Sequence, residues 1–190
     1  MRLTDLTLAA LLAAGSAGAQ EVRAPDAARL AAFDAHLGAA LYQALTEGAA
    51  QDLAVLRDAM AGAAAPLDPA GDWACRTIKV GGLLPVTAYG NFRCRITAGP
   101  DGGWTLVKTT GSQRVKGRIA PDGRFLGVGH VGEAPATDYP GLPPVDQTPV
   151  EPNQTTADVG RFEQMSPTRA RLLLPAPLLE SRFDILYLTR

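Results

Sequence analysis

Basic side chains are concentrated in the middle third of the sequence. Residues 76–118 carry eight basic side chains and one acidic, whereas residues 20–75 carry three and eight, and residues 119–190 carry six and nine. A local excess of positive charge attracts anions, so this third predicts a binding surface for an anionic group. The whole-chain pI of about 6.1 excludes nucleic acid as the expected partner, because nucleic-acid-binding domains are usually basic throughout.

Three of these basic residues alternate along one predicted strand. Arg114, Lys116 and Arg118 are separated by single residues, so they share the face opposite Val115. Arginine suits carboxylate or phosphate recognition, because its planar guanidinium forms two parallel hydrogen bonds. The alternative is a solvated outer face whose charge the acidic helices balance.

Lys79 is the basic residue that most needs a partner. Strand alternation places Trp73, Cys75 and Lys79 on one face and Arg76 on the other. The face with the tryptophan is the apolar one, so Lys79 points into the interior. An isolated ammonium is costly there unless it meets a carboxylate, a ligand anion or water.

Two carboxylates, Glu133 and Glu180, are candidate partners for Lys79, and nothing in the sequence chooses between them. We predict that a small amphiphilic or anionic ligand binds at a basic mouth of the fold. The residues that we assign to this binding are Arg76, Lys79, Arg95, Arg114, Lys116, Arg118 and Glu133.

No arrangement of residues is convincing as a catalytic site. Ser112 lacks the strand-to-helix turn that exposes a nucleophile, and His36 and His130 each stand alone. We find no phosphate-binding glycine motif and no metal-ligand spacing, so we predict no cofactor and no metal. A weak hydrolase that uses carboxylates near the long loop stays open; the candidates are Glu133, Asp138, Glu163 and Glu180.

The two cysteines, Cys75 and Cys94, predict a disulfide. An even pair in an exported protein is more often bonded than free. A redox-active pair and two free thiols are the alternatives. Across adjacent strands, the bridge would lie on the same face as Trp73 and Phe92.

The first 19 residues resemble a cleaved export signal. Arg2 precedes a short apolar stretch, and Ala17 to Ala19 form the small-residue pattern of a cleavage site. The apolar stretch is too short to span a bilayer, and no later segment approaches the length required, so we expect no transmembrane segment in the mature chain. We therefore predict a periplasmic or secreted bacterial protein.

Two regions of different composition and periodicity follow. Residues 20–65 predict a helical hairpin, with helices at about 25–47 and 51–61, because apolar residues recur there at spacings of three and four. Residues 70–190 are rich in β-branched and aromatic residues between glycine and proline turns. We predict eight strands there: 72–80, 88–98, 103–109, 113–120, 124–131, 158–165, 168–174 and 182–189.

The predicted fold is therefore mainly β with N-terminal α, an antiparallel eight-stranded up-and-down barrel preceded by the helical hairpin. A barrel of six or seven strands, or a sandwich, is the competing geometry. Residues 132–157 contain six prolines and no periodicity, so they predict a long loop. This loop is either a functional lid or a surface excursion.

Several motifs resemble known families. The Gly71-x-Trp73 opening is similar to that of the calycin barrels, including the lipocalins, which implies a basic residue over the indole, here Arg190 or Arg182. The segments "GDWACRTIKVGGL", "YGNFRCRI", "TGSQRVKGRI" and "LLLPAPLLESRFDILYL" together resemble a family of small exported bacterial proteins defined only as a domain of unknown function. This second resemblance implies no activity.

We therefore expect an exported, non-catalytic barrel that binds a small ligand. The second hypothesis is an interaction or inhibitor module that uses the outer basic face against an envelope protein. The hydrolase is the third.

Overall fold

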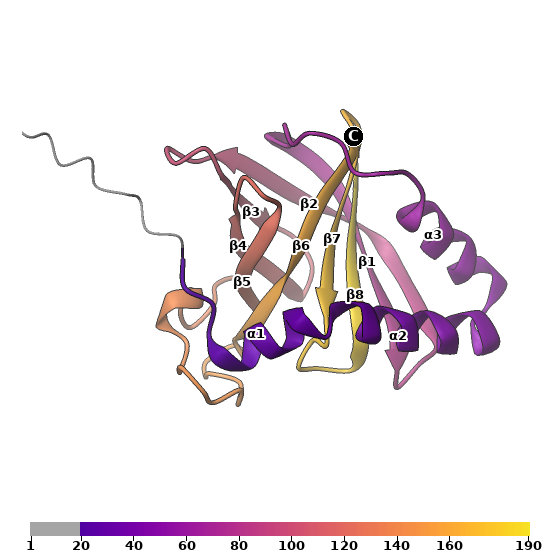
Figure 1. Cartoon of the computed structure of the whole chain (residues 1–190), viewed down its shortest axis with the longest axis horizontal. Helices are drawn as coiled ribbons and strands as arrows, with labels where there is room; N and C mark the ends of the chain where they lie inside the picture. Colours follow the sequence, from indigo (N-terminus) through magenta and orange to yellow (C-terminus); the bar gives the residue numbers. More distant parts are fainter. Residues whose placement is uncertain (1–19) are drawn as a thin grey trace, which may run out of the picture.

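Eight consecutive strands form a closed antiparallel barrel in the computed structural model, which describes residues 20–190 (Figure 1). Each strand pairs with the next, and β1 also pairs with β8, which confirms the predicted up-and-down barrel. The prediction of an export signal falls on residues 1–19, outside the described residues. The strands are β1 Gly71–Gly82, β2 Val86–Ala98, β3 Trp104–Lys108, β4 Gln113–Ile119, β5 Arg124–Val131, β6 Thr156–Ser166, β7 Arg169–Pro175 and β8 Ser181–Thr189.

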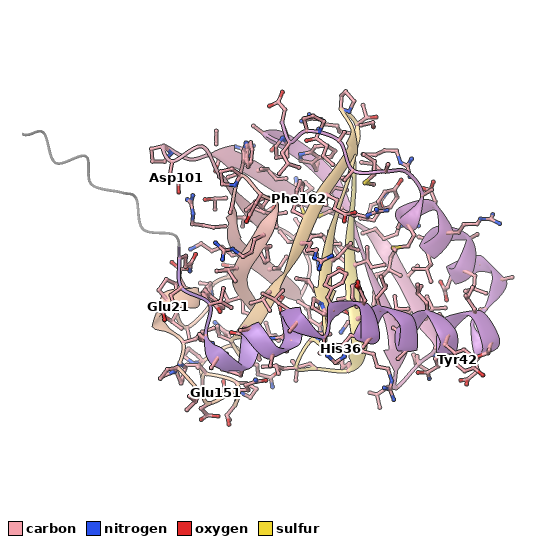
Figure 2. All side chains as sticks on the ribbon, in the orientation of Figure 1. Glu21, His36, Tyr42, Asp101, Glu151 and Phe162 are labelled. Atoms are coloured by element: carbon pink, nitrogen blue, oxygen red, sulfur yellow. A yellow bond between two sulfur atoms is a disulfide. The ribbon has the colours of Figure 1, made fainter. Side chains whose placement is uncertain are left out.

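The strand positions agree with the sequence prediction to within about two residues, because turns that contain glycine or proline separate the strands. Gly123, in the turn between β4 and β5, has a φ of +84°, a conformation that glycine adopts without a steric cost. Such turns alternate between the two ends of the barrel. Asp101, in the β2–β3 turn, therefore lies at one end, and Glu151, in the long loop, lies at the other (Figure 2).

Three helices precede the barrel, where two were predicted. They are α1 Ala24–Ala31, α2 Phe33–Glu47 and α3 Ala50–Met60. The first predicted helix is divided at Ala32, whose ψ of 16° departs from helical geometry. Among the described residues, no helix has both the length and the apolarity that a membrane crossing requires.

The helices cover the side of the barrel, not its end (Figure 1). Buried residues of α2 and α3, such as Phe33 and Leu56, pack in one apolar cluster with the outward side chains of β1 and β8. The ring of Phe33 meets that of Phe183 edge to face, with centroids 5.3 Å apart. The outer faces of β1 and β8 therefore carry a buried apolar cluster of their own where the helices cover them.

Trp73 closes one end of the barrel. Its indole Nε1 donates a hydrogen bond to the carbonyl of Pro69 at 2.8 Å, and the guanidinium of Arg190 lies 4.1 Å from the ring centroid. Of the two arginines considered, Arg190 is therefore the one over the indole. Gly71 has a φ of +131°, and a Cβ there would lie 2.7 Å from the Arg190 Nη1. A side chain at position 71 would displace the arginine.

The disulfide joins Cys75 and Cys94, as predicted, with Cα atoms 5.8 Å apart. Cys75 is in register with Phe92, and Trp73 is in register with Cys94, so the bridge runs diagonally between β1 and β2. It belongs to an apolar cluster that fills the Trp73 half of the barrel and includes Leu106 and Phe125. The bridge and the tryptophan share the inner face.

The long loop is held against the outside of the barrel. Tyr139 and Leu142 pack with outward residues of β5 and β6. The carboxylate of Asp26 in α1 is fully buried, accepts a hydrogen bond from the Tyr139 hydroxyl at 2.9 Å, and forms ion pairs with Arg23 and Arg29. These contacts anchor the middle of the loop to the outer faces of β5 and β6 and to α1.

We predict that the disulfide contributes about 3 kcal/mol to stability, because it closes a loop of 19 residues in the unfolded chain. The double substitution Cys75→Ala and Cys94→Ala should lower the free energy of unfolding by at least this amount in urea denaturation. Urea unfolding of the wild type in the presence of reductant is the control, because it breaks the bridge but keeps both sulfur atoms in the core. Equal urea midpoints for oxidised and reduced wild type would contradict the prediction.

Candidate functional site

A cavity of about 350 Å³ occupies the half of the barrel away from Trp73. It reaches the end formed by the β3–β4 turn, the β7–β8 turn and Gln154 of the long loop. Small-molecule sites in proteins are typically about 300–1,000 Å³, so this cavity has room for one small ligand.

The cavity is polar because the inward-facing residues of several strands are apolar in the Trp73 half of the barrel and charged in the other half. On β8, Leu186 and Leu188 belong to the apolar cluster, while Asp184, two residues earlier, lines the cavity. On β1, Cys75 belongs to the cluster, while Lys79 lines the cavity. Strand alternation thus places charged side chains inside the barrel.

Lys108 is the most buried cation of the cavity, with 5% of its surface exposed. Its Nζ donates a hydrogen bond to the Gln113 carbonyl at 2.6 Å and lies 4.0 Å from the ring centroid of Phe92. Burial, with the nearby charges of Arg114 and Lys79, lowers the pKa of Lys108 to about 8. No described carboxylate forms an ion pair with it.

The other two cations of the cavity differ in their partners. Lys79 forms an ion pair with Glu180, the second of its two predicted partners. Glu180 has a φ of +70°, an uncommon conformation for this residue type, within the tight β7–β8 turn. Arg114 donates from Nε to the Gly111 carbonyl at 3.0 Å and pairs with no described carboxylate. Lys108 points inward, whereas Arg114 belongs to the outward-facing series of β4 with Lys116 and Arg118 and reaches the cavity only at its rim. We call these two cations beside the β3–β4 turn the cationic wall.

Asp158 and Asp184 form the acidic part of the cavity lining. Burial raises the pKa of Asp158 to about 6 and that of Asp184 to about 7. The Ser181 hydroxyl donates to Asp184 Oδ1 at 2.5 Å, whereas Asp158 accepts no hydrogen bond from the described residues. A Cβ at Gly129 would lie 2.7 Å from Asp158 Oδ2, so the glycine makes room for the carboxylate.

His130 lies at the rim of the cavity and is 6% exposed. Its Nδ1 is buried without a hydrogen-bond partner among the described residues. Burial lowers the pKa of His130, as do the charges of Arg114 and Lys116, and this favours the neutral imidazole. In residues 20–190, no three His, Cys, Asp or Glu side chains are grouped so as to hold a metal ion.

The model of one protein family, described as "Domain of unknown function (DUF4893)", matches residues 19–188. The chain belongs to the DUF4893 family. No curated protein and no solved structure gave a significant match. Family membership therefore supplies no activity, and a function for this DUF4893 chain must be argued from its cavity.

The cavity of the DUF4893 chain brings together only two of the predicted ligand-binding residues, Lys79 and Arg114. Glu133 is exposed in the long loop and does not line it. The remaining four point outward with polar partners: Arg76 with Asn91, Arg95 with Asp72, Lys116 with Asp138, and Arg118 with Asp101.

Tyr89 and Glu180, which the sequence analysis did not assign to ligand binding, also line the cavity. Four further charged or titratable residues were not assigned to it: Lys108, Asp158, Asp184 and His130. For three of them, the alternation of side chains along the strand would have predicted an inward direction. Lys108 follows Leu106 by two residues, and Asp184 precedes Leu186 by two, so each shares the inward face with a core residue. Asp158 precedes the core residue Phe162 by four residues, so it also lies on the inward face of its strand.

We predict that Asp184 lowers the free energy of unfolding as the pH rises. Its pKa is near 3.8 in the unfolded chain and about 7 in the fold, so the folded form keeps a proton that the unfolded form loses between these values. Stability therefore falls through this window, and Asp184→Asn removes the loss. The gain of Asp184→Asn over wild type should be larger at pH 7.5 than at pH 5 by about 2 kcal/mol, because one pKa unit is worth about 1.4 kcal/mol.

Urea denaturation at the two pH values measures this difference. Asp68→Asn serves as the matched control, because the Asp68 side chain is exposed. The same gain for Asp184→Asn at both pH values would disprove the assignment.

Proposed function

We propose that this chain binds a small amphiphilic anion inside the barrel mouth, with the acidic head group at Lys108 and Arg114. The observation that carries this proposal is the buried Lys108 ammonium, which lines the cavity and has no carboxylate partner among the described residues. Among the described residues, its polar contacts are the Gln113 carbonyl and the Phe92 ring, and the charge of Asp184 compensates it only at longer range.

The electrostatics of the wall favour an anion. Burial and two neighbouring cations lower the pKa of Lys108, so its protein surroundings disfavour its charged form. A bound carboxylate or phosphate offsets both causes, because opposite charge at short range stabilises the ammonium. Arg114, whose guanidinium has free donors beyond Nε, adds a planar fork that fits an oxyanion.

Apolar residues of the same cavity suit a short hydrocarbon tail. Val115, Leu174 and Leu186 line it on the side of the apolar cluster, and Leu178 and Leu179 line it in the β7–β8 turn. Each buried methylene contributes about 0.8 kcal/mol, so a tail of several carbons adds substantially to binding. The head and tail requirements together define an amphiphile.

We further propose that the protein works in the periplasm or outside a bacterial cell. The Cys75–Cys94 disulfide supports an oxidising compartment, where such bonds persist. The signal-like residues 1–19 support export. The absence of a membrane-spanning helix among residues 20–190 is compatible with this location.

Octanoate tests the binding proposal. We expect wild-type protein to bind it in isothermal titration calorimetry at about pH 6.5, where Lys108 is charged. The substitution Lys108→Met should weaken binding at least about tenfold, because a charged hydrogen bond contributes roughly 1.5–3 kcal/mol and 1.4 kcal/mol is tenfold.

Arg95→Met is the matched control, since Arg95 is exposed and pairs with Asp72 outside the cavity. It should bind octanoate like wild type, and 1-octanol should bind more weakly than octanoate. Equal affinity of wild type and Lys108→Met for octanoate would refute the assigned head-group site.

A further inference from the structure

The cavity has a second charged wall on the far side of the barrel from the cationic one. Strands four places apart face each other in a closed eight-stranded barrel, so β8 faces β4 across the interior. Asp184 lies on β8, whereas Arg114 lies on β4 and Lys108 lies beside it on β3. Asp158, on β6, lies two strands from β4 and two from β8, and we group it with Asp184 as the acidic wall. Charges of both signs therefore line one small cavity, with Lys79 of β1 in register beside Asp184.

We propose that the ligand is a dipolar ion, whose anionic end binds Lys108 and Arg114 and whose ammonium end binds Asp158 and Asp184. This inference rests on the proposed function, because it keeps the same head-group site. It adds the chemical class of the ligand, an amino acid in the broad sense, with the amine separated from the acid by a hydrocarbon spacer.

The carboxylates are available because the protein's own cations are engaged elsewhere. Lys79 pairs with Glu180, and Arg29 bonds to Asp26 and to the carbonyls of Ala157 and Pro175. Among the described residues, only the Ser181 hydroxyl donates to the acidic wall, at Asp184 Oδ1.

Three carboxylate oxygens are therefore left without a donor: both of Asp158 and Oδ2 of Asp184. A primary ammonium has three donors and no acceptor. Its donors match the free acceptors of the acidic wall in kind and number, whereas a plain alkyl chain would leave all three oxygens unsatisfied.

His130 lies at the rim of the cavity but in the outward-facing series of β5, with Leu126 and Val128. Its Nδ1 is buried without a partner at the rim, beside Arg114. A buried polar nitrogen without a hydrogen bond is costly, and native structures contain few. A ligand inside the barrel does not face this nitrogen, so we do not assign His130 to the ligand site.

The pH dependence distinguishes a dipolar ion from a simple anion. An ammonium needs ionised carboxylates, so its binding improves as the pH rises through about 6 and about 7, the pKa values of Asp158 and Asp184. Both ligand classes need protonated Lys108, which is lost near pH 8. The groups that act on the pair are Lys79, Glu180, Arg29, Asp26 and Lys108.

A simple alkanoate shows the opposite trend below pH 8. Ionisation of the two aspartates adds negative charge to the cavity, and this weakens the binding of an anion that brings no cation. The affinity ratio of the amino acid to the alkanoate therefore rises from about pH 5.5 to about pH 7.5.

The experiment compares three pairs of probes by isothermal titration calorimetry: 4-aminobutanoate with butanoate, 6-aminohexanoate with hexanoate, and 8-aminooctanoate with octanoate. We expect at least one amino acid to bind at least about tenfold tighter than its parent at about pH 7.5. The spacer length with the largest gain reports the span between the walls. Asp158→Asn and Asp184→Asn should each reduce that gain and should not weaken alkanoate binding, because each removes negative charge from the cavity at this pH.

The outcomes separate the inference from the proposed function. If the alkanoates bind and no amino acid binds more tightly than its parent alkanoate, the dipolar ligand is excluded and the anion site stands. If neither class binds, both proposals fail. A gain that persists in both variants places the ammonium elsewhere and overturns the inference. If a variant does not fold, the pH series on wild type decides, since a flat affinity ratio overturns the inference.

Discussion

The pairing of β1 with β8 is the constraint on which the rest of this structure depends. It closes the sheet, removes both edges and assigns every second side chain to the interior. An eight-stranded barrel has an interior that its own side chains can fill, or that can hold one small ligand. The choice between these outcomes is made by the residues at the inward positions.

Those residues divide the interior into two parts with different tasks. The half that contains Trp73 and the Cys75–Cys94 bridge is filled with apolar side chains and holds the strands in place. The other half contains Lys108 and two aspartates around a cavity. Buried charges of this kind reduce stability, so the filled half, together with the helices over β1 and β8, offsets the cost of the polar half.

The outer surface explains why the basic middle third is not one continuous site. Closure sends alternate basic residues to opposite sides of the wall, so Lys108 lies inside, whereas Lys116 and Arg118 lie outside. The two outer cations pair with Asp138 and Asp101, which come from loops. A charge excess along the sequence therefore becomes a small interior cationic wall and a largely neutralised exterior.

The sequence alone determined the eight strands, the disulfide and the inward direction of Lys79, because turn glycines and a two-residue period are local properties of the chain. It also determined that the fold begins with helices, although the division of the first helix at Ala32 was not foreseen. Only the tertiary structure decided which charges meet. Asp158 and Asp184 are 26 residues apart, and Lys108 is 50 residues before the first of them. Barrel closure brings all three to one cavity, and burial there, not their residue types, shifts their pKa values.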